Sequence, residues 1–156
     1  MKRLDLTLLF ALALGWSDRA QALGACSVST ITTMDFGAYD VFSSSPRDTT
    51  ATLTIGCVAL TGSQSILMTL SKGSSNTYAM RLMKLGAYAL QYNVFLDAQR
   101  TVIFGDGTGG SSPSGPYAPS VLLLGSFTTT LYGRIYASQN VTAGVFNDNL
   151  TVTVNF

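Results

Sequence analysis

The residues that could carry out chemistry are few, and their types exclude the commonest mechanisms. The 156 residues include no histidine, and all eight acidic residues are aspartates. Without an imidazole, neither a Ser-His-Asp triad nor a Cys-His pair can form, and the commonest zinc ligand is missing. A Ser or Thr nucleophile with a Lys base, or paired carboxylates such as Asp97 and Asp106, is chemically possible. Nothing in the spacing positions such a set, so we expect no enzyme activity and no cofactor.

The glycine-rich run at residues 105–110 has two interpretations. Glycines whose backbone amides cradle a phosphate are typical of nucleotide-binding loops, but such loops end in Gly-Lys-Ser/Thr and precede a helix. This run lacks that ending, and no helical periodicity follows it. Asp106 could ligate calcium, but the cluster of side-chain oxygens that a calcium site requires is missing nearby. We therefore expect a surface turn without a metal or phosphate site.

The first 22 residues have the order of parts found in a secretory signal. Lys2 and Arg3 give a positive start, residues 6–14 are apolar, and Ala20 and Ala22 flank a small-x-small cleavage site. The apolar run is shorter than the roughly 20 residues of a membrane-spanning helix. A buried N-terminal helix is the alternative. We expect cleavage after Ala22, which divides the chain into a signal peptide at 1–22 and one domain at 23–156.

If the chain is exported, its two cysteines, Cys26 and Cys57, are expected to form a disulfide. In an oxidising compartment an isolated pair favours a disulfide over a redox or metal site. The bridge would close a loop of about 30 residues, worth roughly 3–4 kcal/mol in the chain-entropy model. Two free buried cysteines are the alternative.

Charge excludes a further class of partner. Nine basic and eight acidic residues leave a net charge of +1. Nucleic-acid binding requires a clustered basic surface, which this balance argues against.

The elements that must position these residues are strands, because apolar residues alternate with polar ones at period two. The clearest run has Leu150, Val152, Val154 and Phe156 on one face. Seven or eight short strands bounded by turn residues predict an antiparallel sandwich. The predicted strands contain residues 27–34, 51–57, 66–70, 79–83, 90–96, 101–104, 131–136 and 150–156. Residues 105–120 are predicted to be an irregular surface loop.

Several stretches together resemble the spore coat protein U domain, the subunit fold of archaic chaperone-usher pili. The matching pieces occur at residues 26–28, 36–40, 54–57, 81–83, 90–101, 104–107, 132–135 and 148–156. They include Phe-Gly-Ala-Tyr-Asp at 36–40 and Phe-Gly-Asp-Gly at 104–107. Each piece alone is weak, but the ordered series with the paired cysteines covers almost all of residues 23–156.

The resemblance implies an all-β fold: an incomplete immunoglobulin-like antiparallel β-sandwich that lacks its final strand. In the family, a periplasmic chaperone fills the gap first and the extension of a neighbouring pilin subunit replaces it, at an usher; this is strand addition. The residues expected to flank the groove are Val28 on one side and Leu150, Val152, Val154 and Phe156 on the other. The carboxylate of Phe156 would then anchor basic chaperone residues. The alternative, that these side chains are simply core, is compatible with the groove.

One departure from the family concerns the donor segment. Donation requires roughly ten extended residues before the first cysteine, but cleavage after Ala22 leaves three. We therefore expect a strand-accepting subunit at the tip of a surface fibre, with an adhesive role. Tyr117 and residues 121–124 are candidate contacts, with a buried strand as the alternative for the leucines. A non-polymerising spore-coat or cell-surface matrix protein is the second function. In the uncleaved chain, the alternating residues 4, 6, 8 and 10 could occupy the groove.

Overall fold

The chain folds into a sandwich of two β-sheets. The computed structural model describes residues 24–60, 65–117 and 122–156, so the predicted signal segment and its placement lie outside the described residues. The strands in this part are β1 (Ala25–Ile31), β2 (Arg47–Leu60), β3 (Ile66–Leu70), β4 (Arg81–Leu85), β5 (Tyr88–Phe95), β6 (Ile103–Phe104), β7 (Ser111–Ser112), β8 (Ser114–Tyr117), β9 (Leu122–Ile135) and β10 (Val152–Asn155). The all-β prediction is confirmed.

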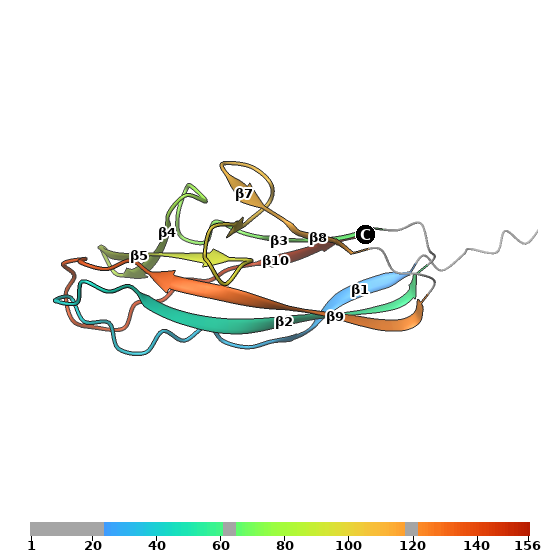
Figure 1. Ribbon diagram of the computed structural model, residues 1–156, viewed down its shortest axis with the longest axis horizontal. Helices are drawn as coiled ribbons and strands as arrows, with labels where there is room; N and C mark the ends of the chain where they lie inside the picture. Colours follow the sequence, from blue (N-terminus) through green and yellow to red (C-terminus); the bar gives the residue numbers. More distant parts are fainter. Residues whose placement is uncertain (1–23, 61–64, 118–121) are drawn as a thin grey trace, which may run out of the picture.

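The two sheets form the layers of an elongated molecule (Figure 1). The larger sheet has the order β1-β2-β9-β5-β6-β7, with β4 paired to β5, and the smaller has the order β10-β3-β8. The antiparallel β2–β9 ladder runs from Arg47↔Ile135 to Leu60↔Leu122 and makes the longest pairing. No helix in the described part of the chain is long and apolar enough to cross a membrane.

Alternation explains the core, because successive side chains of a strand point to opposite faces. Leu53 and Ile55 of β2 and Ile66 and Met68 of β3 have no exposed surface. The opposite face of the β2–β9 pair carries threonines, with the Thr54 and Thr128 hydroxyls 2.9 Å apart. The sheet therefore has one apolar face toward the other layer and one polar face.

Several predicted boundaries need correction. The strand predicted at 27–34 begins and ends earlier, at Ala25–Ile31, and the one predicted at 79–83 is Arg81–Leu85. The predicted loop at 105–120 contains β7 and β8, because β8 pairs with β3 at Ile66↔Tyr117 and Met68↔Ser114. Tertiary pairing thus overrides the local preference of glycine and proline for turns.

A buried arginine joins the ends of several strands. Arg81 has no exposed surface. Its guanidinium donates to the backbone oxygens of Ser71 at 2.8 and 3.0 Å and of Phe104 at 2.7 Å, and to the Asn93 Oδ1 at 2.7 Å. These bonds connect the residue after β3, the end of β6, and β5. The guanidinium also lies over the Tyr78 ring, 5.3 Å from its centroid.

Candidate functional site

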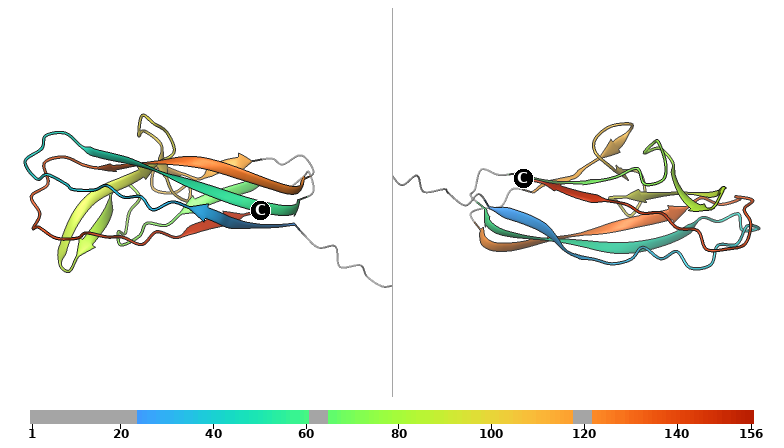
Figure 2. Two further views of the ribbon diagram at one scale, coloured as in Figure 1. Left: turned by 90° about the horizontal axis from the view of Figure 1, so that it is seen from below. Right: turned by 180° about the vertical axis from the view of Figure 1, so that it is seen from behind.

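Two strands at the edges of different sheets leave a gap between the layers. Among the described residues, β1 pairs with β2 alone and β10 pairs with β3 alone. Both run along the same side of the molecule (Figure 2). An unpaired strand edge presents free N–H and C=O groups and is a template for another strand.

The gap contains two adjoining cavities, of about 580 Å³ and about 720 Å³. We call residues 31–41 wall one, residues 141–152 wall two, and the whole depression the groove. Wall one continues from β1, and wall two leads into β10. Both cavities share Met34, Phe36, Met83 and Phe146. The floor, in the core of the sandwich, is lined by Ala51, Leu70, Met83, Leu90, Tyr92, Val94, Leu131 and Ile135.

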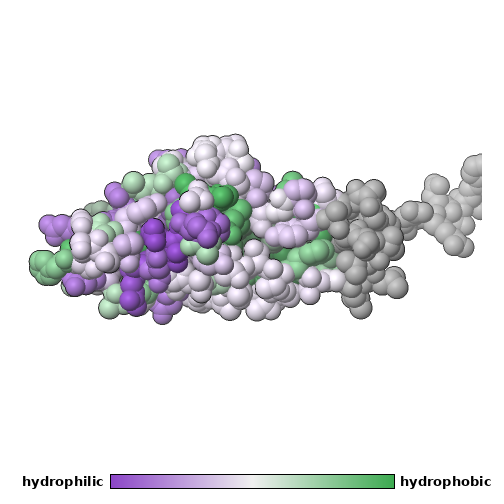
Figure 3. All heavy atoms as spheres, viewed as in Figure 1, coloured by the Kyte–Doolittle hydropathy of each residue, from purple (hydrophilic) through white to green (hydrophobic). Residues whose placement is uncertain are grey.

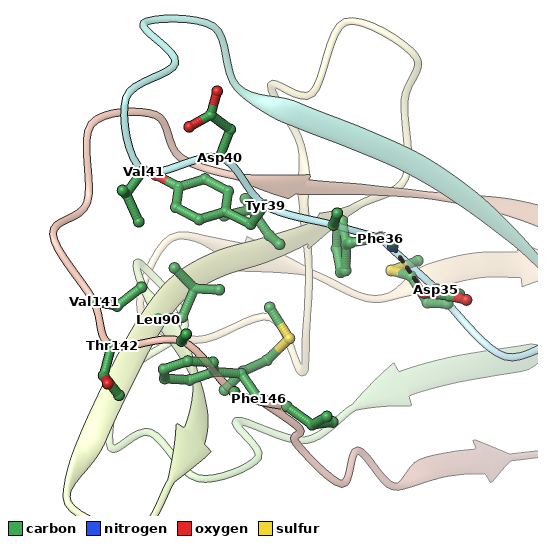
Figure 4. A pocket seen from close by; sticks show the side chains of 17 residues that line it. Asp35, Phe36, Tyr39, Asp40, Val41, Leu90, Val141, Thr142 and Phe146 are labelled. Atoms are coloured by element: carbon green, nitrogen blue, oxygen red, sulfur yellow. Dashed lines mark hydrogen bonds between the residues drawn. The ribbon is translucent and has the colours of Figure 1, made fainter.

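The close view of the larger cavity shows how the two walls face each other (Figure 4). Phe36 and Tyr39 come from wall one, Phe146 from wall two, and Leu90 from β5 lies between them. Apolar side chains therefore converge from both walls and the floor.

The five residues expected to flank a groove lie in different places. Leu150 and Val152 line the smaller cavity, and both are half-buried. Val28, Val154 and Phe156 line neither cavity. Val28 is 38% exposed and Phe156 is 48% exposed. They lie beside the open edges but beyond the hollow.

Among the apolar wall residues of the smaller cavity, four were not predicted from the sequence: Ile31, Met34, Phe36 and Phe146. A usable signal existed for two of them, because Met34 and Phe36 are two residues apart and continue the alternation of the first strand.

Hydrogen bonds from β2 support wall one from behind. The Thr49 hydroxyl donates to the Asp35 backbone oxygen at 2.7 Å, and the Arg47 Nε donates to the Phe36 backbone oxygen at 2.8 Å. Below the wall lies Gly133 of β9, where a Cβ atom would come 2.7 Å from the Phe36 ring and 2.5 Å from the Met34 sulfur. A side chain at position 133 would therefore push wall one out of place.

Wall two is held by backbone and side-chain bonds. Asn147 and Lys84 exchange backbone hydrogen bonds of 2.7 and 3.1 Å, which places the wall against β4. The Asp148 Oδ1 accepts from the Ser74 amide at 2.8 Å and from the Ser74 hydroxyl at 2.7 Å. Gly73 lies so close that a Cβ there would overlap the Asp148 carboxylate.

The predicted disulfide is present between Cys26 and Cys57. The two residues are directly opposite in the β1–β2 ladder, with Cα atoms 4.1 Å apart. The bridge fixes β1 to β2 at the start of the edge strand that leads into wall one.

The two aspartates considered as catalytic candidates accept hydrogen bonds within their own turns. Asp97 accepts from the amides of Thr101 and Val102, and these bonds, that from Val102 first, lower the pKa of its carboxyl. Asp106 accepts from the Thr108 hydroxyl and amide, which likewise lower its pKa. Strand β7, not a helix, follows the glycine-rich run. Within the described ranges, no cluster of three or more His, Cys, Asp or Glu residues could hold a metal ion.

Sequence comparison decides the family. The model of the Spore Coat Protein U domain matches residues 12–153. The chain belongs to this family. The resemblance inferred from the motifs is therefore confirmed. Protein U of Myxococcus xanthus is 29% identical over 150 residues, which cover 85% of this chain and 78% of that protein.

Solved structures show the same fold. One chain of the CsuC–CsuE chaperone–tip adhesion subunit pre-assembly complex, from archaic chaperone-usher Csu pili of Acinetobacter baumannii, matches 86% of this chain with a TM-score of 0.53 and 21% identity. The match spans 40% of the length of that Csu chain. A chain from a chaperone-usher pilus structure concerned with rod uncoiling matches 100% of this chain, with 95% of its own length covered, a TM-score of 0.54 and 13% identity.

Proposed function

We propose that this chain is a secreted subunit of a chaperone-usher surface fibre and that it accepts a strand from a partner into its groove. The observation that carries the proposal is the groove itself, since two open strand edges flank an apolar hollow in a domain of this family. A periplasmic chaperone and then a neighbouring pilin subunit would supply the strand, with assembly at an usher.

An extended peptide fits the chemistry of the groove. Strand addition takes affinity from backbone hydrogen bonds and specificity from pockets for alternate side chains. Wall one has eleven residues, which at about 3.3 Å per residue correspond to roughly 35 Å of extended chain. The occupant would be a strand of about ten residues whose alternate side chains are apolar.

A tip position follows from the predicted cleavage site. If the signal is removed after Ala22, three residues precede Cys26 and reach roughly 10 Å when extended. Such a segment is too short to fill the groove of a second copy, so the subunit would accept a strand without donating one.

The pole remote from β1 supports an adhesive role. Three loop regions meet there: residues 37–46, the β4–β5 turn, and residues 136–146, connected by the Ser138–Ser43 backbone bond (Figure 1). Phe42 is 94% exposed, Val145 79% and Tyr88 56%. In the space-filling view this end carries apolar residues scattered among hydrophilic ones (Figure 3). We propose that this pole contacts an apolar surface.

Of the candidate contacts predicted from the sequence, Tyr117 is less suited to adhesion than the exposed residues of the pole. Tyr117 is half-buried and packs on Phe127, with ring centroids 5.4 Å apart. Leu122 belongs to β9 and pairs with Leu60. Leu123 and Leu124 belong to the same strand, and Val121 lies outside the described residues.

Copurification tests the proposal. The tagged full chain, recovered from the periplasm of its producing cell, should bring down a chaperone, and mass spectrometry should find Leu23 at its N-terminus. Val152→Asp places a charge in the groove and should abolish copurification. Thr153→Asp, on the exposed face of the same strand, should preserve it. Equal copurification of both variants would refute the groove as the chaperone site.

The tip assignment has its own test. Purified protein with Leu23 at its N-terminus should remain monomeric after the chaperone is removed, while a donor peptide binds it. Head-to-tail polymers of this protein alone would exclude a tip position.

A non-polymerising coat or cell-surface matrix protein is the second candidate. The description of the matching family, the Spore Coat Protein U domain, favours a coat role. Recovery of the folded, disulfide-bonded chain without any chaperone, combined with failure to bind donor peptides, would support this function over the first.

A further inference from the structure

We propose that the hydroxyl groups of two tyrosines, Tyr39 and Tyr92, position the two walls of the groove relative to β5 and so keep the groove open for its partner. The inference rests on the proposed strand-accepting function and assigns residues to it. Both are positioning residues, since each acts through the wall that it holds.

Tyr39 anchors wall one. Its hydroxyl donates to the Tyr136 backbone oxygen at 3.0 Å and accepts from the Gln139 amide at 2.9 Å. Both lie in the segment that follows β9. The Tyr39 phenol oxygen thus connects wall one to this segment. The two residues that it bonds lie 97 and 100 positions later in the chain.

The Gln139 side chain is in turn hydrogen-bonded to β5. Its side-chain oxygen accepts from the Gln91 amide at 2.6 Å, and its side-chain nitrogen donates to the Gln91 backbone oxygen at 2.8 Å. The β5–β9 ladder reaches Tyr92↔Ile135. At the next position the Tyr136 amide donates to the Gln91 backbone oxygen at 3.3 Å, and the Gln139 side chain supplements this pairing. Wall one is fixed to β5 through Gln139.

Tyr92, the next residue of β5, anchors wall two. Its ring belongs to the groove floor and is 3% exposed, and its hydroxyl donates to the Asp148 Oδ2 at 2.7 Å. The other Asp148 oxygen binds Ser74. Burial and, second, the bond to Asp148 raise the pKa of Tyr92 above its ordinary value, so the phenol stays protonated and able to donate.

Adjacent residues of one strand therefore fix the positions of both walls. Gln91 holds wall one through Gln139 and Tyr39, and Tyr92 holds wall two through Asp148. Neither wall has a strand on its groove side among the described residues. Ordering a free backbone costs conformational entropy on binding, so walls fixed beforehand bind a strand more tightly.

Tyrosine-to-phenylalanine variants test the inference, since each removes one oxygen and retains the ring. We would compare Tyr39→Phe, Tyr92→Phe and the control Tyr88→Phe, whose ring is 56% exposed. The full, disulfide-bonded chain would be titrated with a synthetic twelve-residue peptide that alternates isoleucine with threonine or lysine. Backbone amide exchange would be measured by NMR without the peptide.

The expected effects are local and differ between the walls. Losing one hydrogen bond should raise the peptide Kd about 3- to 10-fold in Tyr39→Phe, and about 10-fold in Tyr92→Phe, where the acceptor is charged. In Tyr39→Phe, exchange of the Gln139 amide should accelerate. In Tyr92→Phe, exchange of the Ser74 and Asn149 amides should accelerate instead.

The outcomes separate this inference from the proposed function. If both variants behave like Tyr88→Phe in exchange and affinity, or if exchange accelerates equally throughout β2 and both walls, the positioning role is wrong. If the wild-type chain binds no peptide while the exchange pattern is as expected, the tyrosines hold the walls but the strand-accepting function fails.

Discussion

Arg81 and Asn93 form a hydrogen bond of 2.7 Å in which neither side chain has any exposed surface. Asn93 extends this hydrogen-bond network, since its side-chain nitrogen donates to the Tyr78 backbone oxygen at 2.8 Å. Burial lowers the pKa of Arg81 from its ordinary value, but arginine remains protonated in proteins. The ends of three strands thus meet around one desolvated cation.

Replacing Arg81 should therefore destabilise the fold severely. Arg81→Met retains volume but removes the donor from the backbone oxygens of Ser71 and Phe104, and each buried unsatisfied group costs about 1–3 kcal/mol. The Asn93 Oδ1 loses one of its two donors and keeps the Val94 amide. We expect a loss of about 3 kcal/mol or more, measured by urea denaturation. Lys84→Met removes a cation from the same strand at a half-buried position and should cost less than about 1 kcal/mol. Similar midpoints for the two variants would contradict this interpretation.

The disulfide should contribute a large part of the stability. Cys26 and Cys57 are separated by 31 positions, and opening a loop of this size costs roughly 3–4 kcal/mol in the chain-entropy model. The Cys26→Ser/Cys57→Ser variant should lose about that amount in urea denaturation and accumulate poorly after export. Dithiothreitol should destabilise the wild type to the same level and leave the variant unchanged. A wild type insensitive to the reductant would contradict the prediction.

The ion pair on the polar face of the larger sheet predicts a pH dependence. Arg134 donates from two nitrogens to the two Asp48 oxygens, each at 2.8 Å, and this hydrogen bonding lowers the pKa of Asp48 below 3.8 despite some burial. A lowered folded-state pKa stabilises the protein above about pH 4, and this stabilisation disappears as the pH falls through the folded-state pKa. Because Asp48 is partly exposed, the pair is worth about 0.5–1 kcal/mol.

Asp48→Asn should therefore reduce stability at pH 7 and have almost no effect near pH 2. Urea denaturation of the wild type and of Asp48→Asn at both values measures the difference. Arg134→Gln completes a double-mutant cycle, in which the second substitution should add less than it does alone. The prediction fails if Asp48→Asn costs as much at pH 2 as at pH 7.

The apolar pole should determine adhesion without affecting folding. Phe42→Ser combined with Val145→Ser should strongly reduce binding of the protein to polystyrene beads, while the thermal midpoint stays near that of the wild type, because these side chains are largely exposed. Val58→Ser replaces another exposed apolar residue, 45% accessible and paired with Ala25 at the opposite end. Equal losses of binding in both variants would show that general hydrophobicity, not the pole, is responsible.

Sequence alone predicted the fold class from local signals, and it predicted the disulfide because the chain has two cysteines and an apparent export signal. The alternation around Leu53 and Val152 marks strands whatever their neighbours are. Strand β8 was missed because Ser114 and Tyr117 belong to a segment rich in glycine and proline, and only pairing with β3 makes it a strand.

The site was predicted less completely than the fold, for a geometric reason. The sequence indicates which strands are at the edges but not where the sheets separate. The family resemblance predicts Val28, near the start of the first strand, as a groove residue, whereas the hollow begins at Ile31, where β1 ends. The Tyr39–Gln139 and Tyr92–Asp148 contacts join residues 100 and 56 positions apart, and no local pattern predicts such pairs.

The position of the disulfide also determines how the subunit would carry mechanical force. Tension applied to the chain before Cys26 passes through the sulfur–sulfur bond directly to Cys57, because the bridge is the shorter covalent path. Residues 27–56 form a closed loop outside that path, and wall one lies within this loop. Pulling on the chain on either side of the bridge would load residues 57–156, which include wall two, while wall one stays outside the covalent path of the force.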